Sequence, residues 1–367
     1  MKREIKASKG SAYFAASNSR GGFCSYYEGC FRLRVDQMYC IKGGPGTGKS
    51  TLMRRMAACA QRLGWRVEYY YCSSDASSLD AVLLFGKDRS VGFIDATAPH
   101  VFESSLPGVR EHIVDLGRFW NTTSLSLRGE DIKEYNRVKS EGYRSAYRML
   151  CGAGEVSDAI GETVSRCVNG QRLHKLVGSM FRGAKTAAGT GERRVRLSDS
   201  VGMRGRVRLD TYLRECERLC LIEDYYDSAY LLTSRLAQLA ADEGQGVDIS
   251  YHPVLPDRID ALLFRESKTA FVVCESGEIG ELTEQFSPCR IIRMKRLMLP
   301  QPLREVRKEL RRQYRLREAL LDEAGVCLER VAQAHFALEN IYGEAMDFGA
   351  EEAYARQLCL ALFGENE

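Results

Sequence analysis

The feature that most constrains this chain is an internal repeat with an offset of 180 residues (220 − 40). The stretch CIKGGPGTGKSTL begins at Cys40, and the stretch CLIEDYYDSAYLL that aligns with it begins at Cys220. The alignment continues without a gap as far as residue 95, and it pairs LDAVL at 79–83 with IDALL at 259–263. Similarity at a fixed spacing indicates a duplicated structural unit. We therefore predict two related domains.

Length and composition agree with two domains and restrict the partners. A chain of 367 residues with 44% hydrophobic content can bury a core in each domain. No apolar run reaches about 18 residues, so we expect a cytoplasmic protein with no membrane partner. The 13 cysteines are scattered and odd in number, which favours reduced thiols. A net charge of +4 does not by itself indicate a polyanionic partner.

The first of the two stretches carries the strongest motif. GGPGTGKS at 43–50 fits G-x-x-x-x-G-K-[ST] at each constrained position. QMYCIK before it is suited to a buried strand, and STLMRRMAACAQRLG after it has helical spacing and ends at Gly64. The pattern predicts a strand, a phosphate-binding loop and a helix. The alternative is a glycine-rich turn before an ordinary helix.

Each residue type in this motif has a chemical reason. Glycines let backbone N–H groups face a phosphate without Cβ interference, and the helix N-terminus favours an anion. We expect Lys49 to reach the β- and γ-phosphates and Ser50 to bind Mg²⁺, with Thr51 supporting the first helical turn. The predicted cofactors are ATP and Mg²⁺. The predicted nucleotide-binding residues are Gly43, Gly44, Pro45, Gly46, Thr47, Gly48, Lys49, Ser50 and Thr51.

Further strands are predicted at WRVEYYYC and at SVGFID, which ends in Asp95. An acid at the end of such a strand holds Mg²⁺ in phosphate-loop proteins, so Asp95 is the candidate second metal residue. The alternative is an aspartate that caps the next turn. Ala96 stands where many ATP-driven motors carry a glutamate that activates water, so fast hydrolysis is not expected.

Two further residues are candidates for the chemistry. Asp75 follows the second predicted strand, where several small-molecule kinases of this fold place an acid that holds the acceptor hydroxyl. Its alternative is a turn aspartate in CSSDASS. His100 is a candidate to orient water or a substrate, and its alternative is a structural hydrogen bond after a proline turn.

The second stretch lacks the phosphate-binding residues. At the offset of 180, Ala229 takes the place of the lysine and Tyr230 that of the serine. The four glycines become Glu223, Asp224, Tyr226 and Ser228. Three acids, at 223, 224 and 227, would repel a triphosphate. We expect a degenerate domain that serves as a structural partner of the first.

The sequence predicts an α/β protein of two phosphate-loop NTPase domains with parallel sheets and added helices. The expected parts are an intact domain (1–125), a helical insert and linker (126–195), a degenerate domain (196–298) and a C-terminal helical region (299–367). We expect the added helices to form a bundle beside the two sheets. The basic helix REVRKELRRQYRLREALLDE has acidic neighbours and no aromatic platform, so we do not expect nucleic-acid binding. An arginine from the basic segments is a candidate to reach the γ-phosphate.

Three segments carry a family resemblance: GGPGTGKSTLM, CSSDASSLDAV and IDATAPHVFESSLPGVREHIVDLGRFWN. With them the chain resembles an uncharacterised bacterial family, typical of Firmicutes, of tandem phosphate-loop ATP-binding proteins. The family pattern is similar to Cys-Ser-Ser-Asp followed by Asp-Gly-Thr-Ala-Pro-His. Here the matching residues are Asp75, Asp95, Thr97, Pro99 and His100, and Ala96 replaces the glycine. The family often keeps both loops, whereas this chain has lost the second, and the resemblance implies no substrate.

These observations favour an Mg·ATP-binding protein that hydrolyses ATP slowly and undergoes a regulatory or conformational change. The alternatives are a small-molecule or nucleotide kinase and a non-catalytic ATP sensor. A small-molecule substrate, a protein partner or a second copy of the chain are the possible partners.

Overall fold

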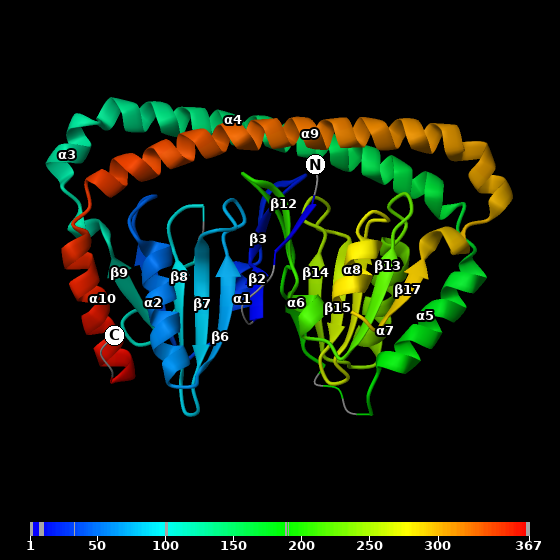
Figure 1. The fold of residues 1–367 in the computed structure, drawn as a ribbon, viewed down its shortest axis with the longest axis horizontal. Coiled ribbons are helices and arrows are strands. Elements are labelled where there is room, and N and C mark those ends of the chain that lie inside the picture. Colours follow the sequence, from blue (N-terminus) through cyan, green and yellow to red (C-terminus); the bar gives the residue numbers. More distant parts are fainter. Residues whose placement is uncertain are drawn as a thin grey trace.

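Two six-stranded mixed sheets lie side by side beneath a pair of long helices in the computed structural model (Figure 1). The structure describes residues 3–6 (backbone alone), 11–32, 34–99, 102–187, 189 and 191–364. Within these residues, no helix is both long enough and apolar enough to cross a membrane.

The first sheet has the strand order β2-β6-β7-β8-β5-β9. Its strands are β2 (Ser11–Phe14), β5 (Gln37–Lys42), β6 (Arg66–Tyr71), β7 (Leu79–Phe85), β8 (Ser90–Asp95) and β9 (Glu111–Asp115). β7 is antiparallel to both of its neighbours, and the other pairs are parallel. The prediction of a parallel sheet is therefore wrong for β7. A short turn joins β7 to β8, which is sufficient for an antiparallel pair, whereas a parallel pair would need a long crossover connection.

The second sheet repeats this order as β10-β14-β15-β16-β13-β17. Its strands are β10 (Arg193–Val195), β13 (Arg218–Glu223), β14 (Val247–Tyr251), β15 (Ile259–Phe264), β16 (Thr269–Cys274) and β17 (Cys289–Arg293). Here β15 is the antiparallel strand. Between the two sheets lie the small strands β1 (Arg3–Lys6), β3 (Ala16–Ser19), β4 (Gly22–Ser25), β11 (Asp199–Gly202) and β12 (Gly205–Leu209).

The main helices are distributed symmetrically over the two sheets (Figure 1). α2 (Lys49–Arg62) packs on the first sheet and α7 (Tyr230–Asp242) on the second. α4 (Gly129–Ser165) and α9 (Pro300–Glu344) run side by side over both sheets. α5 (Gly170–Ala184) packs against α7, and α10 (Phe348–Phe363) against α2. The short helices are α1 (Tyr27–Phe31), α3 (Thr122–Leu127), α6 (Thr211–Arg214), α8 (Ile279–Gln285), η1 (Gly117–Phe119) and η2 (Met294–Leu297).

The strand register corrects the gapless alignment of the repeats. Leu83 pairs with Gly92 and Leu263 pairs with Ala270, so the offset is 180 in β7 (263 − 83) but 178 in β8 (270 − 92). The hairpin of the second repeat is therefore two residues shorter. Asp95 consequently corresponds to residue 273 (95 + 178), not to residue 275.

The central strand and its loop follow an offset of 181. Ile41 pairs with Asp95, and Ile222 pairs with Val273, which gives 181 for β5 and β13 (222 − 41). Lys49 begins α2 and Tyr230 begins α7 at the same offset. The structure thus places Tyr230, rather than Ala229, at the position of the lysine. α7 has 13 residues and α2 has 14, which restores the offset of 180 after the helix.

The expected insert and C-terminal region are equivalent parts of the two repeats. Asn121 N donates to Ala345 O at 2.7 Å, and the same bond recurs 178 residues later from Leu299 N, at 2.7 Å to Cys167 O. The first repeat therefore contains the first sheet, α4 and α5, and the second repeat contains the second sheet, α9 and α10. α5 packs on the second repeat and α10 packs on the first. The expected bundle is correct for α4 with α9 and wrong for α5 and α10.

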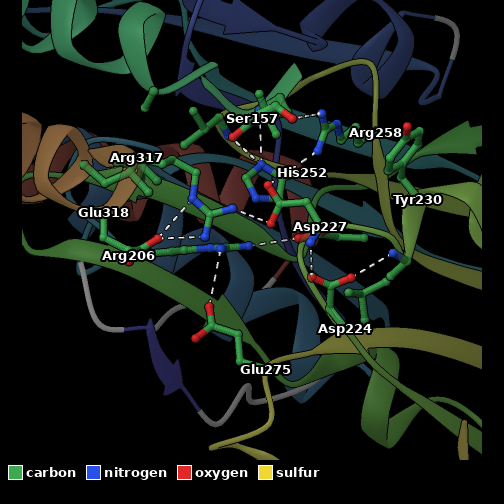
Figure 2. A pocket seen from close by; sticks show the side chains of 18 of the residues that line it. Ser157, Arg206, Asp224, Asp227, Tyr230, His252, Arg258, Glu275, Arg317 and Glu318 are labelled. Atoms are coloured by element: carbon green, nitrogen blue, oxygen red, sulfur yellow. Dashed lines mark hydrogen bonds and ion pairs between the residues drawn. The ribbon is translucent and has the colours of Figure 1, made fainter. Parts of the chain in front are cut away.

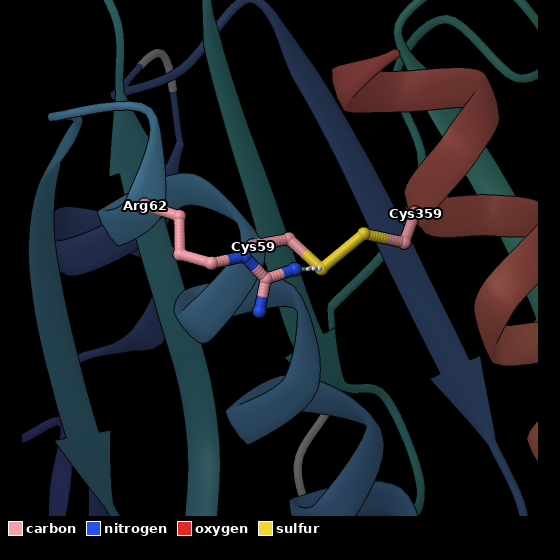
Figure 3. The surroundings of a disulfide bond; sticks show 3 residues. All are labelled: Cys59, Arg62 and Cys359. Carbon is pink, nitrogen blue, oxygen red and sulfur yellow. Dashed lines mark hydrogen bonds between the residues drawn. A yellow bond between two sulfur atoms is a disulfide. The ribbon is translucent and has the colours of Figure 1, made fainter. Parts of the chain in front are cut away.

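A disulfide joins Cys59 on α2 to Cys359 on α10, and Arg62 donates to its Cys59 sulfur at 3.5 Å (Figure 3). The expectation that all thiols are reduced is wrong for this pair. The packing of α10 on α2 brings the two Cα atoms within 6.7 Å, although the residues are 300 positions apart. No local sequence spacing indicates such a pair.

A buried carboxylate connects the two halves of the structure. Glu68 is fully buried in β6, and it accepts hydrogen bonds from Arg66 at 2.6 Å and Arg196 at 2.8 Å. Arg34 lies 3.0 Å from the same carboxylate. Burial alone would raise the pKa of Glu68, but the charges of Arg196, Arg34 and Arg66 hold it below its usual value.

Candidate functional site

The glycine-rich loop, residues 43–48, connects the C-terminal end of β5 to the N-terminus of α2. Gly46 and Gly48 have φ angles of 70° and 81°, a region that favours glycine. A Cβ on Gly46 would lie 2.2 Å from the backbone oxygen of Glu339 on α9. Glycine at position 46 is therefore required both by the backbone conformation and by the close approach of α9.

Lys49 lies over this loop at the start of α2. Its Nζ donates to Gly43 O at 2.9 Å and to Gly44 O at 2.6 Å. The same Nζ is 3.6 Å from Oδ2 of Asp95. The first turn of α2 and the end of β8 thus bring together the predicted phosphate-binding lysine and the predicted metal-binding aspartate.

The two carboxylate oxygens of Asp95 have different partners. Oδ1 accepts a hydrogen bond from Thr97 N at 2.8 Å, as expected of an aspartate that caps a turn. Oδ2 faces Lys49, as described above. The turn-capping and charge-binding roles of Asp95 are therefore compatible.

Ser50 and Asp95 supply the oxygen atoms suited to Mg²⁺. Ser50 Oγ accepts a hydrogen bond from Leu79 N at 3.0 Å, which fixes the hydroxyl beside the loop. Hydroxyl and carboxylate oxygens fit Mg²⁺, which usually keeps several waters and takes other ligands from phosphates. The described residues contain no cluster of three or more His, Cys, Asp or Glu side chains that could hold a metal alone. Mg²⁺ at Ser50 and Asp95 would therefore depend on a bound phosphate.

A cavity of about 840 Å³ lies beside the loop. This volume is within the range of small-molecule and cofactor sites, roughly 300–1,000 Å³. Both long helices contribute to its wall. The side chains that line it include Lys49, Ser50, Asp75, Asp80, Asp95, Lys139, Tyr143, His335 and Glu339.

Asp75 lines this cavity but is also bound to its own turn. One carboxylate oxygen accepts from Ser77 N at 3.1 Å, and both accept from Ser77 Oγ at 2.8 Å. Arg204 lies 3.5 Å away. These contacts match the turn alternative and give the carboxylate an additional cationic neighbour. His100 lies outside the described residues.

Sequence reasoning missed the residues that come from distant parts of the chain. Tyr143 on α4 lines the cavity and donates its hydroxyl to Ser74 Oγ at 2.8 Å. His335 of α9 lies 3.4 Å from Glu339. The long helices had been expected to form a separate bundle, and the sequence predicted only an unassigned arginine of the basic segments as a contact to this site.

The second loop, residues 224–229, contains its own anion (Figure 2). The carboxylate of Asp224 accepts hydrogen bonds from Asp227 N at 2.8 Å and Ala229 N at 2.7 Å. Burial and the neighbouring Asp227 raise the pKa of Asp224 to about 6. In the described part of the second repeat, the adjoining pocket is only about 100 Å³. Backbone N–H groups that could bind a phosphate are therefore occupied by a side chain.

Arginines surround the second acid of this loop. Asp227 forms an ion pair with Arg317 of α9 and lies 3.6 Å from Arg258 (Figure 2). Glu223, by contrast, pairs with Arg293 at 2.9 Å at the ends of neighbouring strands. Of the three predicted acids, Asp224 and Asp227 thus line the pocket beside the second loop, whereas Glu223 pairs with Arg293.

Comparison of the chain with models of protein families, with curated proteins and with solved structures finds no match.

Proposed function

We propose that the protein binds one Mg·ATP per chain at the glycine-rich loop and hydrolyses it slowly to drive a conformational change. The observation that carries this proposal is the position of Lys49, over the loop and 3.6 Å from Asp95, at an 840 Å³ cavity. The loop N–H groups and Lys49 would bind the phosphates, and Ser50 and Asp95 would hold Mg²⁺. Bound Mg²⁺ would neutralise the phosphate charge that develops during transfer.

The position of Ala96 supports slow turnover. Ala96 follows Asp95 directly, is 2% exposed, and donates its N–H to Ile41 O at 3.0 Å. The chain thus places a methyl group where a water-activating carboxylate would be expected. The conformational role is supported by α4 and α9, which line the cavity and extend over the second sheet.

A small-molecule kinase is the second candidate, because Asp75 and Asp80 line the same cavity as Lys49. A carboxylate there could accept the proton of an acceptor hydroxyl. The hydrogen bonds from Ser77 to Asp75 weaken this candidate, because they occupy both carboxylate oxygens.

Calorimetric titration with Mg·ATP tests the proposal. We expect one site per chain, and we expect Lys49→Ala to weaken binding on the order of 100-fold or more, because charged hydrogen bonds to phosphate are lost. Lys133→Ala is the control, since Lys133 lies on the exposed face of α4 and pairs with Glu130 at 2.8 Å. Release of both ADP and phosphate would support hydrolysis, and ADP without phosphate would support transfer to an acceptor. Binding without either product would leave a non-catalytic sensor. Equal binding by wild type and Lys49→Ala would refute the site.

A further inference from the structure

Lys139 of α4 is a cation in the cavity that the glycine-rich loop borders. Its side chain is half-buried, and the described residues give it no ion-pair partner within 4.0 Å. Burial and the charge of Lys49 lower the pKa of Lys139. Lys49 is paired with Asp95, but a half-buried Lys139 near that second positive charge is unfavourable unless an anion contacts it.

The second repeat contains the equivalent cation, and there it has an anionic partner. At the offset of 178 that relates the long helices, Lys139 corresponds to Arg317 (139 + 178). Arg317 of α9 forms an ion pair with Asp227 in the second loop (Figure 2). At the loop offset of 181, Asp227 corresponds to Gly46 (227 − 181). In the second repeat, therefore, the cation on the long helix binds an anion that belongs to the loop itself.

The first loop has no acid at this place. Its residues are glycines, proline and threonine, followed by Lys49, and the acids that line the cavity come from other segments. An anion at the place of Asp227 would therefore come from a ligand. In the second repeat, the carboxylate of Asp227 stands where an anionic ligand group would be expected in the first. The nucleotide that the proposed function places at the loop supplies such a group as a phosphate.

We propose that Lys139 binds the terminal phosphate of a nucleoside triphosphate and makes the site prefer a triphosphate over a diphosphate. The inference depends on the proposed nucleotide site. The loop N–H groups would enclose the inner phosphates, whereas the terminal phosphate would be the one that faces α4 across the cavity. A lysine is suited to this contact as a compact charge with three donors.

The contact also connects the nucleotide to the long helices. Lys139 lies on α4, which pairs with α9 over both sheets. A ligand shifts a conformational equilibrium only by its differential affinity for the two states. The bond from Lys139 to the terminal phosphate is present with a triphosphate and absent with a diphosphate, so it supplies such a difference.

The test compares the dissociation constants of Mg·AMPPNP, a non-hydrolysable triphosphate, and Mg·ADP by calorimetry. We expect Lys139→Met to weaken AMPPNP binding roughly 10- to 100-fold, as for a charged hydrogen bond, and to change ADP binding by less than about twofold. Lys139→Arg should retain the preference for the triphosphate. Lys133→Met removes the same charge from the exposed face of the same helix and should leave both dissociation constants unchanged.

The outcomes separate this inference from the proposed function. If wild type binds both nucleotides and Lys139→Met weakens both equally or neither, the role of Lys139 is refuted while the site stands. If wild type binds neither nucleotide, the proposed function is refuted and the role of Lys139 with it. Retained ADP binding by Lys139→Met also shows that the variant is folded.

Discussion

The ion pair between Arg317 and Asp227 gives the sharpest test of the second repeat. Arg317 has 11% of its side chain exposed and Asp227 has 15%, so both charges are largely removed from water. Burial alone would raise the pKa of Asp227, but Arg317 and then Arg258 hold it below its usual value. Replacing Arg317 by methionine keeps the bulk and leaves the carboxylate with Arg258, 3.6 Å away.

We expect Arg317→Met to lower the free energy of unfolding at pH 7 by about 3 kcal/mol, the lower end of the cost of breaking a buried pair. The double variant Arg317→Met/Asp227→Asn should recover most of this loss, because the buried carboxylate is neutralised and Arg258 keeps Asp158 as its partner at 3.2 Å. Urea-induced unfolding followed by circular dichroism at 222 nm (a wavelength chosen for helix) measures both values.

The pH dependence follows from the lowered pKa of Asp227. A carboxylate with a lowered pKa stabilises the fold above its unfolded-state pKa and loses this effect as the pH falls through its folded-state pKa. Wild type should therefore lose more stability on acidification than Arg317→Met. A single variant as stable as wild type, or a double variant no better than the single one, would show that the pair does not hold α9 to the second loop.

Three further predictions concern the first repeat. Gly46→Ala should abolish nucleotide binding in calorimetry, because its Cβ would meet Glu339 O at 2.2 Å, and a normal affinity would contradict the loop geometry. Asp95→Asn should leave metal-free nucleotide binding intact while Mg²⁺-dependent turnover falls on the order of 100-fold or more, and unchanged turnover would assign the metal to other residues. Glu68→Gln should destabilise the fold by about 3 kcal/mol above pH 5, because Arg196 loses one of its two buried carboxylate partners and keeps only Asp248 at 3.4 Å. The difference from wild type should shrink in acid, and equal urea midpoints at pH 7 would contradict this.

Local patterns were sufficient to predict the central part of the first repeat. The strand, glycine-rich loop and helix around 37–62 are each encoded within a few residues, and the structure has β5 and α2 there. The end of β8 at Asp95 was predicted for the same reason. Its approach to Lys49 follows because β5 and β8 are parallel neighbours whose C-terminal ends meet at one edge of the sheet.

The remaining features depend on contacts between distant segments. The offset changes from 181 in β13 to 180 in β15 and to 178 in β16, and the sequence similarity alone could not locate these changes. The Cys59–Cys359 disulfide forms because α10 of the second repeat packs on α2 of the first. The approach to Gly46 occurs because α9 of the second repeat extends over the first sheet. The apolar periodicity of α9 and α10 does not predict these contacts, because an apolar helix face does not specify which of the two sheets it packs on.

The exchange of α5 and α10 has a consequence for the integrity of the molecule. Equivalent backbone hydrogen bonds tie α5 and α10 each to the opposite half, as two subunits related by a twofold axis would make them. The disulfide adds a covalent link at α10, whereas α5 contains no cysteine. The connection between α5 and β10 is therefore not what keeps the halves together. A single cut in that connection would leave α5 on α7, and α10 on α2 with its disulfide, so the two fragments would stay associated as a heterodimer.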